Sequence, residues 1–286
     1  LMLHTNDPGY RGEYQAEEMS NAEYHSVGLP WCSAHRLAMF SQWGPATVTH
    51  EVECPAQPSA AMVLGSAMHS KILTPDLFNQ EFRVWKGDRR TKAGKEEYAQ
   101  LQLNSQGADI LNAEQEHQVN GMRDAVMQHS TLGRMVEKAV KHGNTERSLF
   151  YEYADVPCKS RIDAMCMMEN GEVALLDLKT TSRSMAVDDL VRTCANYGYV
   201  EQLAFYSAMC KQAGIGHSRV LIGFVGSKAP YPVRVCELTP DWLQAATQVN
   251  LLRLCMWKNA DWDCPEDNEE PIADLEMPAW YGNSIQ

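Results

Sequence analysis

Apolar residues dominate the stretch 159–181, KSRIDAMCMMENGEVALLDLKTT, on both sides of a short polar turn at 169–171. Two apolar runs of this length beside a turn sequence are typical of a β-hairpin. Burial of an unpaired charge is strongly unfavourable, so charged residues within such strands indicate either close partners or a functional site. Three charged side chains lie in the middle of these strands: Asp163, Asp177 and Lys179.

The length of the turn decides which side chains of the hairpin share a face. A two-residue turn at 170–171 places Asp163 opposite Leu178, whereas a three-residue loop at 169–171 places it directly opposite Asp177. The glycine that ends the longer loop suits a left-handed conformation, so we predict the second register. Residues two apart on a strand point to the same face, so the lysine that follows Asp177 joins the two carboxylates.

Other segments have the periodicities of strands and helices. Strand patterns cover residues 146–155, 218–226 and 232–238. Helical patterns cover residues 34–43, 60–73, 112–126, 135–141, 186–195, 199–214 and 239–257. The segment 44–60 contains three prolines and is expected to be a loop. We therefore expect an α/β fold with a mixed central sheet of about five strands flanked by helices.

Turn residues and charge divide the chain into three parts. Residues 1–30 are polar and turn-rich and are expected to form an extended N-terminal arm, followed by a single domain at 31–260. Residues 261–286 form an acidic C-terminal tail that carries much of the net charge of −12. This negative charge is therefore remote from the hairpin in sequence.

The composition is that of an ordinary globular protein. Of the 286 residues, 44% are hydrophobic, which is enough for a sizeable core. Nine cysteines with no C-x-x-C pair favour a reducing cytoplasm over a disulfide framework or a zinc ribbon. No apolar run approaches the ~20 residues of a membrane span, so we expect a soluble, intracellular protein. The chain starts at Leu1, which leaves open that it is a piece of a longer protein.

A histidine adds to the chemistry of the hairpin. His69 lies on the helix predicted for 60–73, four residues after Gly65 on one helical face. A histidine and two carboxylates that converge would coordinate a hard divalent cation, Mg²⁺ or Mn²⁺. Lys179 would orient a water nucleophile or neutralise charge that develops on a phosphate, which favours phosphodiester hydrolysis. The alternative is a buried Asp-Lys ion pair that supports the hairpin, beside a core histidine bonded to a carbonyl.

The strongest basic cluster covers residues 83–95, RVWKGDRRTKAGK, with six of the 25 basic residues in thirteen positions. In an acidic chain such a cluster is a candidate phosphate contact, and a solvated loop is about equally favoured. The net charge of −12 by itself argues against a general nucleic-acid binder, because phosphate binding needs a positive surface.

Four motifs, in order along the chain, resemble those of the PD-(D/E)xK nuclease superfamily in its RecB-like branch. They are Gly65-Ser-Ala-Met-His69, Asp163, Asp177-Leu-Lys179 and Gln202-x-x-x-Tyr206. Five further stretches are similar to RecE (exonuclease VIII) nuclease domains: NDPGY, RRTKAGKEE, CKSRIDAM, LLDLKTT and MPAW. The resemblance covers nearly the whole chain and implies a PD-(D/E)xK nuclease-like core.

The resemblance also implies roles for individual residues. The implied metal ligands are His69, Asp163, Asp177 and the backbone carbonyl of Leu178. The implied catalytic residues, besides the two aspartates, are Lys179 for the nucleophilic water and Gln202 with Tyr206 for the scissile region. The candidate DNA contacts are Arg89, Arg90, Lys95 and, on the strand face of the first aspartate, Arg161. Glu146 is a weaker candidate near the metals.

The implied activity is that of a Mg²⁺-dependent exodeoxyribonuclease in which Mn²⁺ can substitute and two ions bind. It would digest one strand of linear double-stranded DNA from the 5′ end, leaving 3′ overhangs for DNA recombination and repair. A single-strand annealing protein is the implied partner, a ring-shaped homotetramer the implied assembly, and the cytoplasm of a bacterium the implied location, with a phage origin equally compatible.

The chain departs from relatives of this superfamily in two ways. It lacks the clustered cysteines of iron-sulfur nucleases, so we expect no such cluster. Ile162 stands where RecE-like sequences commonly have a proline before the first aspartate, which a strand tolerates readily.

Two other functions are alternatives to the duplex exonuclease. One is a DNA-end-binding protein with a vestigial metal site, which the intact set of aspartates, lysine and histidine disfavours. The other is a RecB-like nuclease that acts on single strands or flaps. A comparison of cleavage on blunt duplex, single strand and closed circle separates the three.

Overall fold

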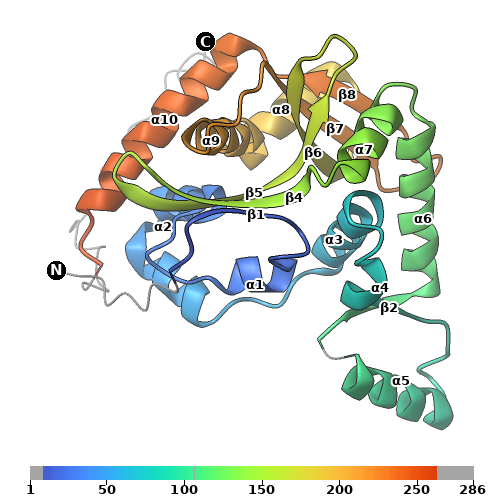
Figure 1. Ribbon diagram of the computed structural model, residues 1–286. Helices are drawn as coiled ribbons and strands as arrows, with labels where there is room; N and C mark the ends of the chain where they lie inside the picture. Colours follow the sequence, from blue (N-terminus) through green and yellow to red (C-terminus); the bar gives the residue numbers. More distant parts are fainter. Residues whose placement is uncertain (1–8, 106, 263–286) are drawn as a thin grey trace, which may run out of the picture.

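The computed structural model describes residues 9–105 and 107–262. At its centre is a six-stranded sheet in the order β1-β4-β5-β6-β7-β8 (Figure 1). The neighbours β6 and β7 are parallel and the other pairs are antiparallel, so the sheet is mixed, as predicted. The strands are β1 (Gly12–Tyr14), β4 (Thr145–Tyr153), β5 (Val156–Met167), β6 (Val173–Thr181), β7 (Arg219–Gly226) and β8 (Val233–Glu237).

Helices cover both faces of this sheet, and each layer has its own hydrophobic core (Figure 1). One core is formed with α2 (Ala34–Glu53), α8 (Val187–Tyr197), α9 (Tyr199–Gln212) and α10 (Pro240–Asn259). The other is formed with α3 (Ala60–Leu73), α4 (Phe78–Glu81), α6 (Ala113–Gln128) and α7 (Leu132–Lys141). The α/β fold predicted from the periodicities is therefore confirmed.

Polar side chains begin several helices where the sequence provides cap residues. Ser33, Ser59 and Thr239 each accept a hydrogen bond from a backbone N–H in the first turn of α2, α3 and α10. Asn112 and Gln115 form the predicted capping box at the start of α6. These bonds satisfy N–H groups that have no partner within the helix.

The β5–β6 hairpin has the register predicted from its turn. The backbone N–H of Met168 donates to the carbonyl of Glu172 at 2.7 Å, which closes a three-residue loop. Gly171 ends this loop with a φ of 84°, a left-handed conformation that glycine adopts without steric cost. The register of the ladder places Asp163 opposite Asp177.

Two segments predicted as loops contain regular structure. The segment 44–60 is helical up to Glu53, because Gly44 kinks α2 with a φ of 77° and Pro45 starts a new helical turn, where its missing N–H is not needed. The basic cluster 83–95 begins on β2 (Phe82–Trp85) and ends on α5 (Lys92–Asn104), so only 86–91 is a loop. β2 pairs in parallel with β3 (Asp109–Asn112) in a separate small sheet that the sequence did not predict.

The described part of the segment expected to be an extended arm is instead packed against the sheet. β1 pairs with the edge of β4, so the sheet has six strands and not about five. α1 (Asn21–Ser26) and its neighbours bury Met19, Tyr24 and Trp31 around Phe150. These apolar residues are scattered among turn residues with no period, which is why the pattern did not reveal them. The domain division at residues 31 and 260 stays a prediction.

Most of the predicted acidic tail, with its MPAW motif, lies in 263–286, outside the described residues, as do the first three residues of NDPGY. Among the helices that the structure describes, none combines the length and apolar character needed to cross a membrane.

Candidate active site

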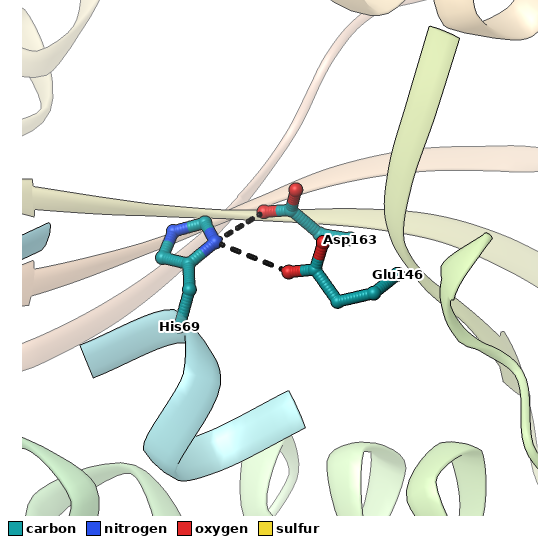
Figure 2. A group of neighbouring side chains, drawn as sticks. All are labelled: His69, Glu146 and Asp163. Carbon is teal, nitrogen blue, oxygen red and sulfur yellow. Dashed lines mark ion pairs between the residues drawn. The ribbon is translucent and has the colours of Figure 1, made fainter. Parts of the chain in front are cut away.

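Four secondary-structure elements bring the predicted charged residues together at the middle of the sheet. Asp163 lies on β5, opposite the Asp177 and Lys179 of β6, and His69 reaches them from α3. Glu146 lies next to them on β4. Figure 2 shows His69, Glu146 and Asp163 pointing toward one another.

His69 is held by the backbone of β6. Its Nε2 lies 2.8 Å from the carbonyl oxygen of Leu178, a distance at which Nε2–H donates a hydrogen bond. Its Nδ1 faces two carboxylates, 3.5 Å from Oδ2 of Asp163 and 3.7 Å from Oε1 of Glu146 (Figure 2). The imidazole therefore presents Nδ1 to Asp163 and Glu146, which together with Asp177 make up the acidic group of the site. The carbonyl of Leu178, predicted as a metal ligand, instead accepts a hydrogen bond from the imidazole.

Asp163 is fixed by the same peptide segment. Its Oδ2 accepts a hydrogen bond of 2.8 Å from the backbone N–H of Leu178. One residue of β6 thus orients both the aspartate, through its N–H, and the histidine, through its carbonyl. Such outer contacts fix the direction in which ligand atoms point.

Glu146 is held by Arg161, which the sequence made a candidate DNA contact. The Nε of Arg161 donates to Oε2 of Glu146 at 2.7 Å, and its Nη1 donates to the carbonyl of Met19 and the hydroxyl of Ser148. Arg161 is only 7% exposed. All the contacts of its guanidinium are therefore inside the protein, where it positions Glu146. Arg161 does not face the solvent, from which DNA would approach.

Asp177 and Lys179 form a buried ion pair. The Nζ of Lys179 lies 2.8 Å from Oδ2 and 3.1 Å from Oδ1 of Asp177, and the hydrogen bond goes to Oδ1. Asp177 is 1% exposed, and both of its carboxylate oxygens lie within 3.1 Å of the Lys179 ammonium. The lysine thus neutralises much of the charge of this buried carboxylate.

Burial and the neighbouring carboxylates shift the pKa values of His69, Asp163 and Lys179. Burial lowers the pKa of His69, but the charges of Asp163 and Glu146 outweigh it and raise the pKa to about 9. Burial raises the pKa of Asp163 to about 7, with a contribution from the negative charges of Asp177 and Glu146. Burial opposes the charge of Lys179, yet the two aspartates hold its pKa above the usual value. Without a cation the site therefore carries excess negative charge, which protons partly neutralise.

The residues present fit a divalent cation. His69, Glu146 and Asp163 each offer a ligand atom, and these atoms lie within 4.8 Å of one another. One imidazole nitrogen with carboxylate oxygens is a donor set that Mn²⁺ or Mg²⁺ accepts. The structure thus brings together two of the predicted ligands and adds Glu146, while Asp177 lies beside them and is paired with Lys179. The sequence carried only a weak signal for Glu146, because its contact with His69 and Asp163 arises from strand pairing and helix packing between segments remote in sequence.

Tyr206 of α9 lies near the aspartates of the site, and Gln202 lies one helical turn before it. The side-chain amide of Gln202 donates to the hydroxyl of Tyr206 at 2.8 Å, as expected for residues one helical turn apart. Burial raises the pKa of Tyr206 well above its usual value, and the charges of Asp177 and Asp163 raise it further. The tyrosine is thus close enough to the aspartates to feel their charge and stays protonated.

The predicted basic contacts lie elsewhere. Arg89 and Arg90 are in the loop before α5, which projects away from the main sheet (Figure 1). Arg90 forms a 2.9 Å ion pair with Asp88, and Arg89 lies 4.0 Å from the ring centroid of Tyr98. Lys95 is exposed on α5. The structure does not bring these three residues to the acidic group, and their contact with DNA stays a prediction.

Comparisons with known proteins agree with this fold. Residues 32–273 match the family described as "PDDEXK-like domain of unknown function (DUF3799)". A solved structure from Eubacterium rectale, named as a candidate exonuclease, aligns with a TM-score of 0.58 at 15% identity, over 93% of this chain and 95% of that chain. At this identity the likeness shows a shared fold. Another solved structure, SSO0001, aligns over 66% of this chain and 85% of its own at 12% identity, but its TM-score of 0.28 supports no argument. The search of curated proteins finds no match.

The family match covers most of the chain, including both aspartates, the lysine, the histidine and the glutamate of the site. The chain therefore belongs to the PDDEXK-like family DUF3799.

Proposed function

We propose that this protein is a metal-dependent nuclease that hydrolyses phosphodiester bonds of DNA. The observation that carries the proposal is the convergence of His69, Glu146 and Asp163 beside the buried Asp177–Lys179 pair. A structural ion pair alone would not need three further ionisable side chains at the same point of the sheet, because each adds a desolvation penalty. An excess of buried negative charge is instead what a cation site needs.

Bound divalent cations would supply a water of lowered pKa and neutralise charge on the phosphate. His69, Glu146 and Asp163 would hold them, with Asp177 as a further ligand that shares its carboxylate with Lys179. In the metal-free site the two aspartates raise the pKa of Lys179, so its positive charge is available to neutralise negative charge that develops on the phosphate.

Tyr206 is the second group that would contact the phosphate. It receives a hydrogen bond from Gln202, which leaves its own hydroxyl proton free to donate to a phosphate oxygen. Gln202 thereby positions the tyrosine.

In its finer form, the proposal is an exonuclease that digests linear double-stranded DNA from 5′ to 3′, leaves 3′ overhangs and uses two Mg²⁺ ions. A tetrameric ring and a single-strand annealing partner belong to the same proposal. This form is supported by the RecE-like motifs NDPGY, RRTKAGKEE, CKSRIDAM, LLDLKTT and MPAW. Light scattering of the purified protein tests the tetramer, and co-purification with an annealing protein tests the partner.

The test is cleavage of DNA by the purified protein with Mg²⁺ or Mn²⁺. The substrates are blunt linear duplex labelled at the 5′ or 3′ end, single strand and closed circle. We expect release of 5′ label from linear duplex and no cleavage of the circle. Preferred cleavage of single strands would replace the duplex exonuclease with a flap or single-strand nuclease. Binding of ends without cleavage would show that the metal site is vestigial.

Matched variants separate catalysis from stability. Asp177→Asn and Lys179→Met are expected to reduce cleavage by about a hundredfold or more. Asp155→Asn and Lys258→Met remove a surface ion pair with the same 2.8 Å separation and are expected to leave cleavage unchanged. Substantial activity in either site variant would remove that residue from the catalytic set.

A further inference from the structure

A row of cations and aromatic rings leads from Lys179 to the protein surface. The Nζ of Lys179 lies 5.0 Å from the ring centroid of Tyr199. The rings of Tyr199 and Tyr197 are stacked, with centroids 5.7 Å apart and an interplanar angle of 22°. The guanidinium carbon of Arg183 lies 5.4 Å from the ring centroid of Tyr197. Each member thus contacts the next, and the row begins at a residue of the proposed catalytic site.

The backbone holds this row in place. Tyr197 ends α8 and Tyr199 starts α9, and Gly198 between them has a left-handed φ of 66° that caps α8. Arg183 follows β6 by two residues, and its backbone N–H donates to the hydroxyl of Thr181 at 3.0 Å. Two helix ends and a strand end therefore position the rings and the guanidinium.

The outer residues of the row, Tyr197 and Arg183, are exposed, and packing within the protein does not explain why a large ring lies there. Tyr197 is 55% exposed, which leaves a large ring partly in water. The side chain of Arg183 is exposed and forms no ion pair with any residue that the structure describes. In a chain with 37 acidic and 25 basic residues, an arginine without a carboxylate beside an active site suggests an external anionic partner.

We propose that Arg183, Tyr197 and Tyr199 form a platform that holds the DNA strand being cut. An unpaired base, or the exposed face of a terminal base pair, stacks on the ring of Tyr197, and the guanidinium of Arg183 contacts a backbone phosphate. Tyr199 supports the outer ring and links it to Lys179. This inference rests on the proposed nuclease function and adds to it the surface that binds the strand.

The chemistry of DNA fits these three side chains. Aromatic rings bind any base, because every base has a π face, whereas arginine recognises phosphate without regard to sequence. One strand of duplex DNA rises about 3.4 Å per nucleotide, so a base on Tyr197 would lie within about four nucleotides of a phosphate at Lys179. The platform would therefore hold the strand close to the cleaved bond and tolerate any sequence.

The experiment measures binding of single-stranded oligonucleotides that contain 2-aminopurine, whose fluorescence is quenched by stacking. Low-salt buffer without divalent cations prevents cleavage. We expect Tyr197→Leu to weaken binding by about fivefold or more and to abolish the quenching that the protein adds. Tyr197→Phe keeps the ring and is expected to retain both. Trp43→Leu removes another exposed ring, 68% exposed on α2, and is expected to change neither.

Arg183→Gln tests the phosphate contact independently. The slope of log affinity against log salt is expected to fall by about one, while the quenching remains. Circular dichroism and thermal melting establish that the variants are folded.

If Tyr197→Leu binds the oligonucleotide and quenches 2-aminopurine as well as the unchanged protein does, the stacking is refuted. If the salt dependence of binding is unchanged in Arg183→Gln, the phosphate contact is refuted. Cleavage with Mg²⁺ is measured in parallel. If the unchanged protein cleaves DNA but Tyr197→Leu alters neither binding nor quenching, only the platform is refuted. A protein that never cleaves refutes the nuclease, whatever Tyr197 contributes to binding.

Discussion

Binding of a cation to the acidic group should release protons in a number that depends on pH. The pKa of His69 is raised to about 9 and that of Asp163 to about 7, because each lies buried among other charges. A cation requires the neutral imidazole and the ionised carboxylate, so both groups must lose any proton they carry. At pH 8 about nine tenths of the histidines and about one tenth of the aspartates are protonated, which gives about one proton per cation.

At pH 6 nearly all the histidines and about nine tenths of the aspartates carry a proton, so the number rises to about two. Because proton release opposes binding, cation affinity should fall about tenfold per pH unit below pH 9 and more steeply below pH 7. The measurement is calorimetric titration of metal-free protein with Mn²⁺ in buffers of different ionisation enthalpy. The slope of the observed heat against that enthalpy gives the number of protons.

His69→Gln is the matched variant, since it retains a polar side chain but carries no titrating group. Loss of the imidazolium charge raises the pKa of Asp163 further, so the variant should release at most one proton at pH 6, against about two in the unchanged protein, while weaker binding persists. A slope near zero at both pH values in the unchanged protein would refute the reasoning, because it would mean that the cation binds without displacing the histidine proton.

Three further predictions concern stability and are measured by denaturant unfolding. Arg161→Met leaves the carboxylate of Glu146 buried without its partner and should cost about 3–5 kcal/mol; a loss below 1 kcal/mol would show that water reaches Glu146. Gly171→Ala forces a side chain into a φ of 84° and should cost about 1 kcal/mol, whereas Gly216→Ala, in open space without a positive φ, should be close to neutral. Burial lowers the pKa of Lys159 to about 7. Because the unfolded lysine keeps its proton up to about pH 10, the unchanged protein should gain up to about 1.4 kcal/mol per pH unit above pH 7 relative to Lys159→Met, and parallel pH profiles would contradict this.

The environment of Arg161 illustrates a limit of strand periodicity. The alternation correctly indicates that Arg161 and Asp163 share a side of the strand. It says nothing about what packs there. The described part of the predicted arm, residues 9–30, covers the arginine through Met19 and leaves it 7% exposed. A surface role for a charged residue therefore requires knowledge of every segment that crosses the strand.

The sequence by itself determined the local structure of this protein. The glycine at position 171 and the length of its turn set the hairpin register, and cap residues such as Ser59 and Asn112 set the helix starts. These features depend on interactions between residues a few positions apart, so the residue pattern contains them. The motif order also indicated a PD-(D/E)xK type of domain, which the match over residues 32–273 shows.

Only the tertiary structure decided which charges meet. Glu146 joins His69 and Asp163 because β4 pairs with β5 and α3 crosses beside them, whereas Asp177 turns to Lys179. The row from Lys179 through Tyr199 and Tyr197 to Arg183 likewise joins the end of β6 to the junction of α8 and α9. Distances between side chains remote in sequence follow from how the layers pack, and no short-range pattern encodes that packing.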